Sequence, residues 1–330
     1  MLDEMTRLRI FCEVASHCSF TKAAQVLGYA QPSVSHHVAQ LERELGAQLF
    51  DRQPRRLQLT DAGRVFLEHA RQVLGQLADA EREVNDTVRS GAGRLRLAAS
   101  SSAAATLVPA AAGTFHARRP SVQLSLIEAD TATAVLGVIA GDFDLGLIYD
   151  YPALGVPEDR EVDREPLFSD HMAVAVPAGS PLARLREVPL GALADEEWVT
   201  PHTDTRCWDA LTLACRNAGF TPQPVHQTND YMAMQGLVAT GVGVAVLPRL
   251  AVAIARRPGI ALLPLAEPAI ERVTFIVTRR GSYKSPAADA FGAALRGALE
   301  AASDPELPLE AYDLVHAVGA QPRVLTRGNG

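Results

Sequence analysis

Residues 19–50, SFTKAAQVLGYAQPSVSHHVAQLERELGAQLF, predict two short helices joined by a tight turn. Ser19 can cap the first helix, because its hydroxyl can accept a hydrogen bond from a free backbone N–H, and Gly28 ends that helix. Pro32 suits the first turn of the second helix, where its missing N–H costs nothing, and Gly46 ends the second helix. The stretch is therefore a helix-turn-helix in outline.

The second helix has one apolar face and one polar face. The apolar positions recur at i, i+4, i+7 and i+11 and are Val34, Val38, Leu41 and Leu45. The opposite face, with its N-terminal edge, holds Gln31, Pro32, Ser33, Ser35, His36, Gln40 and Arg43. Short hydrogen-bonding side chains suit base edges and phosphates in a major groove, so this face predicts a DNA recognition helix. Taken alone, the pattern also fits an ordinary two-helix corner of an enzyme.

A basic hairpin is predicted directly after the second helix. Leu49 and Phe50 precede the tip, and Leu57 and Leu59 alternate with a polar residue after it. The tip itself carries Arg52, Pro54, Arg55 and Arg56. Two short strands with a basic tip make a wing, whose arginines can attract the DNA backbone.

From Leu8 to Gly63 the sequence resembles, without a gap, the LysR-type transcriptional regulators, through SFTKAAQVLGYAQPSVSHHVAQLERELGAQLFDR and LQLTDAG. One departure is Ala30, where the family often has a Ser or Thr that caps the recognition helix. The resemblance implies that the DNA-binding residues are Gln31, Pro32, Ser33, Ser35, His36, Arg52, Arg55, Arg56 and Thr60. It also implies double-stranded DNA, RNA polymerase and a small-molecule effector as partners, and a homodimer that pairs into a homotetramer.

Composition and charge fit a multidomain protein that binds DNA locally. The 330 residues suit two or three domains, and 48% of them are hydrophobic. The net charge is −7, and residues 1–60 hold seven Lys and Arg against six Asp and Glu. DNA contact must therefore come from clustered charges such as those of the wing. With no apolar stretch near the roughly 20 residues of a membrane span and no signal segment, the expected location is the cytoplasm, without a membrane partner.

A long helix should follow the wing, with Thr60 in position to cap it. Its apolar row steps by four and three through Phe66, Ala70, Val73, Leu77, Ala80, Val84 and Thr87. This heptad spacing predicts packing against a partner helix, and the family uses this linker helix to dimerise. The predicted dimer residues are Phe66, Ala70, Val73, Leu77 and Val84. The alternative is a helix that packs on its own domain.

The chain beyond residues 90–93 predicts an α/β domain, because strands and helices alternate. The predicted strands are 94–99, 122–128, 145–149, 172–176, 198–200, 242–247 and 273–278. The predicted helices are 103–119, 133–140, 206–218, 230–240 and 286–301. DFDLGLI at 142–148 and GLVATGVGVAVLP at 236–248 resemble the effector-binding half of the LysR-type family, which is itself similar to periplasmic solute-binding proteins.

The expected fold class is therefore α/β, with an N-terminal all-α winged helix-turn-helix and a C-terminal two-lobed, periplasmic-binding-protein-like effector domain. The predicted units are a DNA-binding domain at 1–60, a linker helix at 61–90, an effector domain at 91–301 and a tail at 302–330. Within the effector domain, lobe I is 94–167 with 269–301, and lobe II is 168–268. A short helix at 309–318 is predicted in the tail.

Polar residues at the ends of predicted strands indicate an effector site between the lobes. Ligands of open α/β sheets bind beyond the carboxyl ends of the strands, near helix N-termini. The candidate residues are Ser100, Ser102, Asp130, Thr131, Tyr149, Pro201, His202 and Thr203. They could hold a small carboxylate or similar polar metabolite, whereas Asp130 and Asp150 disfavour a strongly anionic one. The alternative is that Ser100 and Thr203 are simple helix caps.

No enzymatic or metal-binding motif emerges from the sequence. It contains no G-x-S-x-G, H-E-x-x-H or Walker motif, and Gly241 and Gly243 form a lone G-x-G. We therefore expect no catalytic residue, cofactor or metal; the alternative is an α/β enzyme fused to a DNA-binding module.

Four cysteines, Cys12, Cys18, Cys207 and Cys215, show no C-x-x-C pair and no histidine at metal spacing, so they are predicted to be reduced packing residues. A redox sensor is the alternative. Cys215 lies in a stretch that resembles peroxide-sensing LysR-type proteins, although Cys207 is one residue too close to match their pair.

Overall fold

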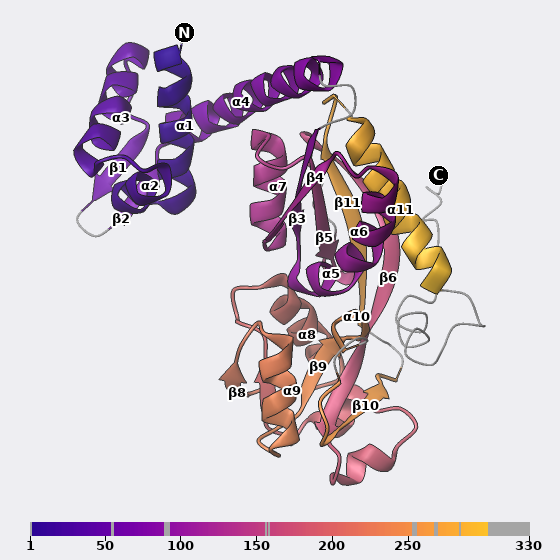
Figure 1. The fold of residues 1–330 in the computed structure, drawn as a ribbon. Coiled ribbons are helices and arrows are strands. Elements are labelled where there is room, and N and C mark those ends of the chain that lie inside the picture. The colour runs from indigo at the N-terminus through magenta and orange to yellow at the C-terminus, as the bar shows by residue number, and fades with distance from the viewer. Residues whose placement is uncertain are drawn as a thin grey trace, which may run out of the picture.

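The computed structural model describes residues 2–53, 56–88, 93–155, 157, 159–252, 256–266, 270–283 and 285–302. The tail beyond residue 302, with its predicted short helix, lies outside the described residues. The chain forms an N-terminal unit, a long helix and a two-lobed unit (Figure 1). The N-terminal unit consists of α1 (Leu2–His17), α2 (Phe20–Leu27), α3 (Gln31–Leu45), β1 (Phe50–Gln53) and β2 (Arg56–Leu59).

The N-terminal unit packs its three helices and hairpin around aromatic rings. The Phe11 ring on α1 lies 5.4 Å from the Phe50 ring. Ser19 caps α2, since its hydroxyl accepts from the Lys22 N–H at 3.2 Å, and Gly28 ends that helix with a φ of 70°. Val34, Val38 and Leu41 of α3 are buried as predicted. Leu45 was wrongly placed on this face: it is 45% exposed, because α3 ends there at Gly46.

The long helix α4 (Asp61–Val88) begins as part of the N-terminal unit. The Thr60 hydroxyl caps it, accepting from the Gly63 N–H at 2.9 Å. Phe66 packs its ring on Phe11, with centroids 5.2 Å apart, and Ala70 is only 2% exposed. Phe66 and Ala70, which were predicted to pack against a partner helix, therefore pack on the chain's own N-terminal unit. Further along, Val73, Ala80 and Val84 are exposed, and Leu77 is half-buried.

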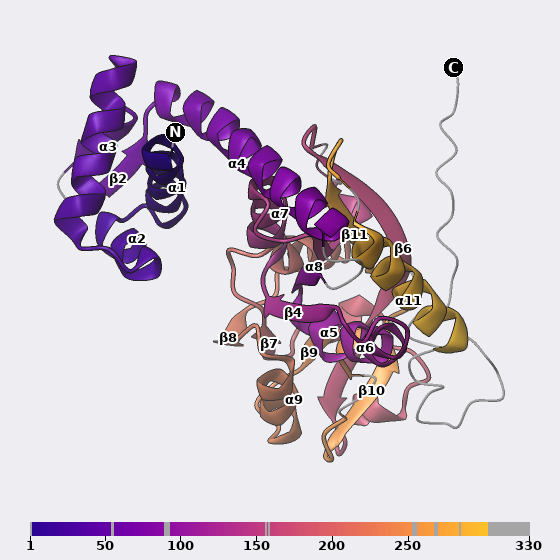
Figure 2. The same cartoon turned by 45° about the horizontal axis from the view of Figure 1, so that its top comes forward.

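The middle of α4 is docked on the two-lobed unit, beside α7 (Thr131–Ala140) (Figure 2). A Cβ atom on Gly75 would lie 2.5 Å from the Ile139 carbonyl oxygen, so the two helices touch through backbone. The Arg279 guanidinium donates to the Gly75 carbonyl oxygen at 3.0 Å and pairs with the Asp79 carboxylate. The contact fixes α4 to the chain's own two-lobed unit.

The close contact at Gly75 predicts a substitution effect. Gly75→Ala should force α4 away from α7 and lower stability to urea by about 1–3 kcal/mol, because the new methyl group meets backbone. The matched control is Gly297→Ala in α11 (Pro286–Ala302), where a Cβ would meet nothing within 4 Å. That control should gain roughly 0.5–1 kcal/mol, since alanine favours a helix. Equal urea curves for the two variants would contradict the docked helix.

The two-lobed unit is built on a mixed sheet. The described strands form a seven-stranded sheet in the order β10-β6-β11-β5-β3-β4, with β9 also paired to β6. Their bounds are β3 (Arg94–Ala99), β4 (Gln123–Glu128), β5 (Leu145–Asp150), β6 (Val162–Pro177), β9 (Ala245–Pro248), β10 (Ile260–Pro264) and β11 (Glu271–Arg279). A separate parallel pair joins β7 (Trp198–Thr200) to β8 (Pro224–Gln227). β3 runs parallel to β4 and β5, whereas β11 is antiparallel to β5 and β6.

Helices cover both faces of the sheet. They are α5 (Ser101–Ala105), α6 (Leu107–Arg118), α7, α8 (Arg206–Asn217), α9 (Tyr231–Ala239), α10 (Arg249–Val252) and α11, with 3-10 turns at Pro152–Leu154, Pro181–Arg184 and Leu190–Leu193. In lobe I, α6 and α11 pack on one face through Phe115 and Phe291, and α7 packs on the other through Val138.

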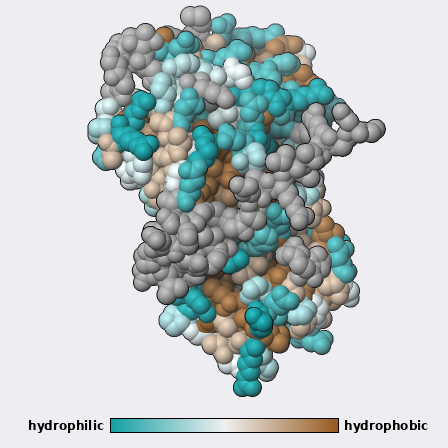
Figure 3. Space-filling view, turned by 90° about the vertical axis from the view of Figure 1, so that its right-hand side faces the viewer, coloured by the Kyte–Doolittle hydropathy of each residue, from teal (hydrophilic) through white to brown (hydrophobic). Residues whose placement is uncertain are grey.

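On the face that carries α11, hydrophobic side chains gather on the lower part of the molecule (Figure 3).

The two-lobed unit differs from the predicted elements in several places, and its strands β8 and β10 were not predicted. The predicted helix at 103–119 is two helices, broken at Thr106. Pro109 has no N–H to give to the Ala105 carbonyl oxygen, so α6 starts anew with the proline in its first turn. The strand predicted at 172–176 is the end of the much longer β6, which passes from lobe I into lobe II.

Candidate DNA interface and effector cleft

The polar face of α3 is open to solvent at its N-terminal end. Gln31, Pro32 and His36 are exposed, and Ser33 and Ser35 are half-buried. Ala30 stands at the N-cap and gives no side-chain hydrogen bond, as its residue type requires. The five predicted contact residues of α3 therefore lie in its first two turns and are exposed or half-buried.

Two carboxylates that sequence reasoning missed hold α3 in place. Glu42 Oε1 accepts from the backbone N–H groups of Leu49 at 2.8 Å and Phe50 at 3.2 Å, which ties the helix to the wing. Glu44 pairs with the buried Arg7 of α1, and this hydrogen bond lowers the pKa of Glu44. Spacing along α3 could not show this, because both partners come from other elements.

The wing forms as predicted, as an antiparallel hairpin in which Phe50 pairs with Leu59. The backbone of Arg52 and Arg56 lies in its two strands, whereas Pro54 and Arg55 lie outside the described residues. Thr60 follows the wing, and its hydroxyl also donates to the Gln48 carbonyl oxygen at 2.7 Å. Thr60 thus serves the corner between the wing and α4.

An open cavity of about 1030 Å³ lies between the two lobes. It brings together five of the predicted effector residues, Asp130, Thr131, Tyr149, His202 and Thr203. A smaller neighbouring cavity of about 180 Å³ is lined by Ser100 and Pro201, and shares Asp130, Tyr149, Thr205 and Asn229 with the first. We call the larger space the outer cavity and the smaller one the inner cavity. Sequence reasoning missed Arg164, Arg206, Asn229 and Tyr231, which also line them.

Several cleft residues have structural roles as well. Asp130 caps α7, accepting from the Thr133 N–H at 2.8 Å, and the Thr131 hydroxyl donates to the Tyr149 carbonyl oxygen at 3.0 Å. Thr205, and not Thr203, caps α8 by accepting from the Trp208 N–H at 3.2 Å. The alternative that Thr203 is a helix cap is therefore wrong. Ser100 occupies the N-cap position of α5 without a side-chain capping bond.

Ser102 does not line either cavity, so its placement in the effector site was wrong. It is 2% exposed, and its hydroxyl accepts from the Arg272 guanidinium at 3.0 Å. Arg272 is fully buried and donates to the Asp170 carboxylate at 3.0 Å through Nε. The Tyr149 ring covers the guanidinium carbon at 4.8 Å. This group lies where β6 and β11 pass between the lobes, with Arg272 directly opposite Asp170.

Burial shifts the pKa of three side chains that line the inner cavity. It raises the pKa of the Tyr149 and Tyr231 hydroxyls and of the Cys207 thiol. It also raises the pKa of Cys215 to about 12. Thiolates, not thiols, react with oxidants, so these two buried cysteines do not favour the redox alternative. The tyrosines remain neutral and can donate hydrogen bonds.

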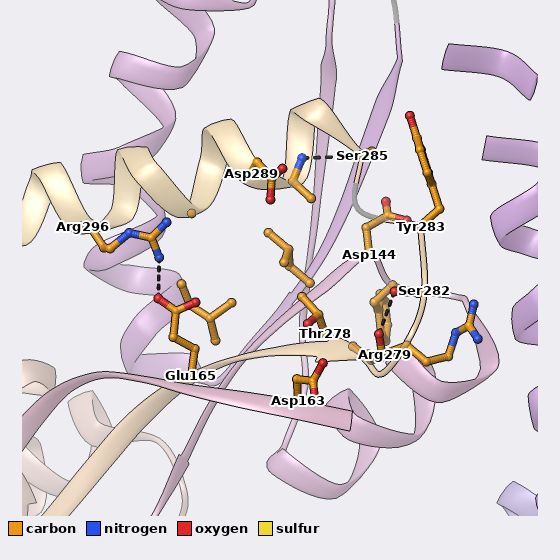
Figure 4. A pocket seen from close by; sticks show the side chains of 16 residues that line it. Asp144, Asp163, Glu165, Thr278, Arg279, Ser282, Tyr283, Ser285, Asp289 and Arg296 are labelled. Atoms are coloured by element: carbon orange, nitrogen blue, oxygen red, sulfur yellow. Dashed lines mark hydrogen bonds and ion pairs between the residues drawn. The ribbon is translucent and has the colours of Figure 1, made fainter. Parts of the chain in front are cut away.

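A third cavity, of about 110 Å³, lies in lobe I between β6, β11 and α11 (Figure 4). Arg296 donates to Glu165 at 2.6 Å across it, and Asp144 pairs with Arg96 at 2.9 Å. Among the described residues, no group of three or more metal-ligating side chains is found. Of the carboxylates that line this cavity, Asp144, Asp163 and Glu165 are held in ion pairs of the fold.

The geometry defines a DNA-binding protein with a winged helix-turn-helix, joined by a long helix to a two-lobed ligand-binding domain. Residues 5–64 match the sequence profile of the bacterial regulatory helix-turn-helix proteins of the LysR family, and residues 89–300 match the LysR substrate binding domain. The chain belongs to the LysR family of transcriptional regulators.

Curated relatives share sequence over most of the chain. The uncharacterised regulator YnfL of Escherichia coli is 33% identical over 74% of this chain and 82% of its own length. The regulator ShiR of Corynebacterium glutamicum is 33% identical over 84% of this chain and 94% of its own. AlsR of Bacillus subtilis is 30% identical over 74% of this chain and 80% of its own.

Solved structures share the fold. A full-length OxyR variant from Pseudomonas aeruginosa is 25% identical with a TM-score of 0.62, and covers 88% of this chain and 94% of its own. Full-length CbnR complexed with its target DNA is 22% identical with a TM-score of 0.53, and covers 89% and 99%. Within the described residues, no helix is long and apolar enough to span a membrane.

Proposed function

We propose that this LysR-type regulator binds a pseudo-palindromic promoter site in double-stranded DNA and that a small polar metabolite in the interlobe cleft alters its action there. RNA polymerase is the further partner on which it acts. The observation that carries the proposal is the pairing, in one chain, of an exposed polar α3 face with a large cleft lined by polar groups from both lobes. Because it acts on DNA, we place it in the cytoplasm. We also propose that it has no catalytic role and needs no cofactor.

The DNA contacts divide into two kinds. Gln31, Ser35 and His36 read base edges from α3, with Pro32 and Ser33 at the groove edge. The wing arginines Arg52, Arg55 and Arg56 attract phosphates or the minor groove without reading sequence. Thr60 contributes by fixing the corner after the wing.

Single substitutions should separate the two kinds of contact. Gln31→Ala or His36→Ala should cost about 1–3 kcal/mol on the specific site and little on random DNA, because base-edge hydrogen bonds are lost. Arg55→Ala should weaken both DNAs alike and reduce the salt slope by about 1. Fluorescence anisotropy with labelled duplexes measures all three. Equal losses on both DNAs for Gln31→Ala and His36→Ala would remove them from base reading.

Each predicted segment of the chain has its own function in this proposal. We propose a DNA-binding domain at 1–60, a linker helix at 61–90, an effector domain at 91–301 and a tail at 302–330. The exposed positions Val73, Ala80 and Val84, with the half-buried Leu77, are proposed to pair two α4 helices in a homodimer. Two such dimers would form the homotetramer. Phe66 and Ala70 support α4 from its own domain.

The experiment that tests the function is DNA footprinting at the divergent promoter beside the protein's own gene, with and without a metabolite library. We expect one protected site with two half-sites, and a change in protection with at least one metabolite. No protection at any promoter region tested would contradict the DNA-binding role. Protection that no metabolite changes would contradict the effector role.

A further inference from the structure

Three charged side chains meet at one wall of the outer cavity. Asp150 ends β5 in lobe I and is 1% exposed, and Arg206 begins α8 in lobe II. Arg206 Nε donates to Asp150 Oδ1 at 2.6 Å, and Nη2 donates to the Gly155 carbonyl oxygen at 2.8 Å. Arg164, on β6 in lobe I, is the third member. The cavity wall is therefore an ion pair between the lobes with a second arginine beside it.

This group is not internally satisfied. Arg164 Nη1 lies 3.6 Å from Asp150 Oδ2, which is too long for a hydrogen bond. Within the described part of the chain, Asp150 Oδ2 and the Nε and Nη1 of Arg164 are buried without any hydrogen-bond partner. Buried polar groups are nearly always hydrogen-bonded, so the two Arg164 nitrogens, which are donors, indicate a missing acceptor. Arg164 and Arg206 carry two positive charges and Asp150 carries one negative charge, so one positive charge is not compensated within the group.

We propose that Arg164 and Arg206 bind the single carboxylate of an organic acid whose apolar body lies against Val135, Leu136 and Tyr149 of the outer cavity. The inference rests on the proposed function, since it names the chemical class of the metabolite in that cleft. Guanidinium groups recognise carboxylates through paired N–H donors. Because the ligand contacts an arginine from each lobe, its binding links the two lobes directly.

Asp150 acts as a positioning residue for Arg206. Its Oδ1 is occupied by Arg206 and by the Tyr151 N–H at 2.9 Å, so the guanidinium is held at the cavity wall before a ligand enters. A donor held in its bound geometry loses less entropy on binding. Arg206 remains 35% exposed, and therefore accessible from the cavity.

The remaining carboxylates restrict the ligand to one negative charge. Asp130 and Asp204 also line the outer cavity, and both are exposed. Asp130 is occupied at the start of α7, but its charge remains. A second anionic group would face these side chains, whereas a single carboxylate is matched by the arginines. Asp130 and Asp204 thus disfavour polyanions and not every anion.

The test uses the full-length protein and paired probes. Hexanoate, cyclohexanecarboxylate and benzoate are each compared with the corresponding primary amide, at millimolar concentration, by the shift in melting temperature and by calorimetric titration. We expect at least one acid to stabilise the protein and its amide not to do so. Arg206→Gln and Arg164→Gln should each weaken binding of that acid about 10- to 100-fold, since a charge-assisted contact is lost.

Arg216→Gln is the matched control, because Arg216 lies exposed on the same helix but lines neither cavity. It should bind the acid as the parent does. Arg206→Gln leaves the Asp150 carboxylate buried without its partner and could prevent folding. In that case the double variant Asp150→Asn with Arg206→Gln, which removes both charges, takes its place. That variant should fold and lose acid binding.

Three results would overturn the assignment: no acid of the set binds, an amide binds as well as its acid, or the arginine variants bind the acid like the parent. Footprinting separates this failure from failure of the proposed function. An uncharged metabolite that changes the footprint would leave the effector role intact and overturn the acid site. Acid binding that needs both arginines but never changes the footprint would support the site and contradict the effector role.

Discussion

Replacing Arg272 by Met is expected to lower the free energy of unfolding by about 3–5 kcal/mol, because it leaves the Asp170 carboxylate buried without its counter-charge. Both side chains are fully buried, and among the described residues the Leu250 N–H, at 3.2 Å, is the hydrogen-bond donor that Asp170 would keep. Urea unfolding followed by circular dichroism measures the loss. The matched control is Arg280→Met, whose partner Asp163 is 49% exposed and where we expect a loss of about 0–1 kcal/mol.

The deficit of Arg272→Met should depend on pH. Burial raises the pKa of Asp170, and Arg272 opposes that rise in the parent protein. In the variant the folded-state pKa is higher still, so the folded protein takes up a proton that the unfolded chain holds less tightly. The stability difference from the parent should be smallest in acid and grow as pH rises through the folded-state pKa. A deficit independent of pH would mean that Asp170 is not the uncompensated charge.

A second double variant separates charge from packing. Arg272→Met with Asp170→Leu removes both charges and should recover most of the lost stability. Recovery would show that the pair itself adds little net stability. Failure to recover would assign the loss to packing around Ser102 and Tyr149, which both contact Arg272.

Local sequence signals predicted those parts of the fold that depend on neighbouring residues. Ser19, Gly28 and Gly46 act where the capping pattern placed them, and β3 and β7 occupy the predicted residues. Such elements need only a cap, an apolar period or a glycine in the left-handed region, all of which are visible in a short stretch. The winged helix-turn-helix belongs to this group.

Contacts between distant segments could not be predicted in this way. Leu45 follows the helical period, yet it is exposed because the helix ends beside it. Ser102 follows a strand, as a cleft residue should, but Arg272 from 170 positions later holds it in the interior. The sequence could not show that Arg206 and Arg164 line the cleft, because their common partner, Asp150, lies on another element. Pairing of charges across a fold is set by topology and not by spacing.

The linker helix shows the same limit. A heptad period reports only that one face of α4 is apolar, and not which surface covers it. The chain's own N-terminal core covers Ala70, whereas Val73 and Val84 are 41% and 61% exposed. In the proposed homodimer, this exposed stretch would contact the second α4 helix.

Val84→Asp is expected to weaken the homodimer at least about 100-fold, because each dimer would bury two uncompensated carboxylates in an apolar seam. The matched control is Val65→Asp on the same helix. Val65 is 60% exposed, nearly the same as Val84, but it lies outside the heptad row. Both variants add the same charge at an exposed valine, so helix propensity and solubility change alike.

Analytical ultracentrifugation across a concentration series gives the dimer dissociation constant for both variants. Val84→Asp should sediment as a monomer at micromolar concentration, with an unchanged melting profile of the N-terminal unit, while Val65→Asp remains dimeric. DNA binding should follow the oligomer: the Val84→Asp monomer should lose affinity for a site with two half-sites but bind a single half-site like the parent. A Val84→Asp dimer as tight as the Val65→Asp dimer would exclude the exposed row of α4 as the interface.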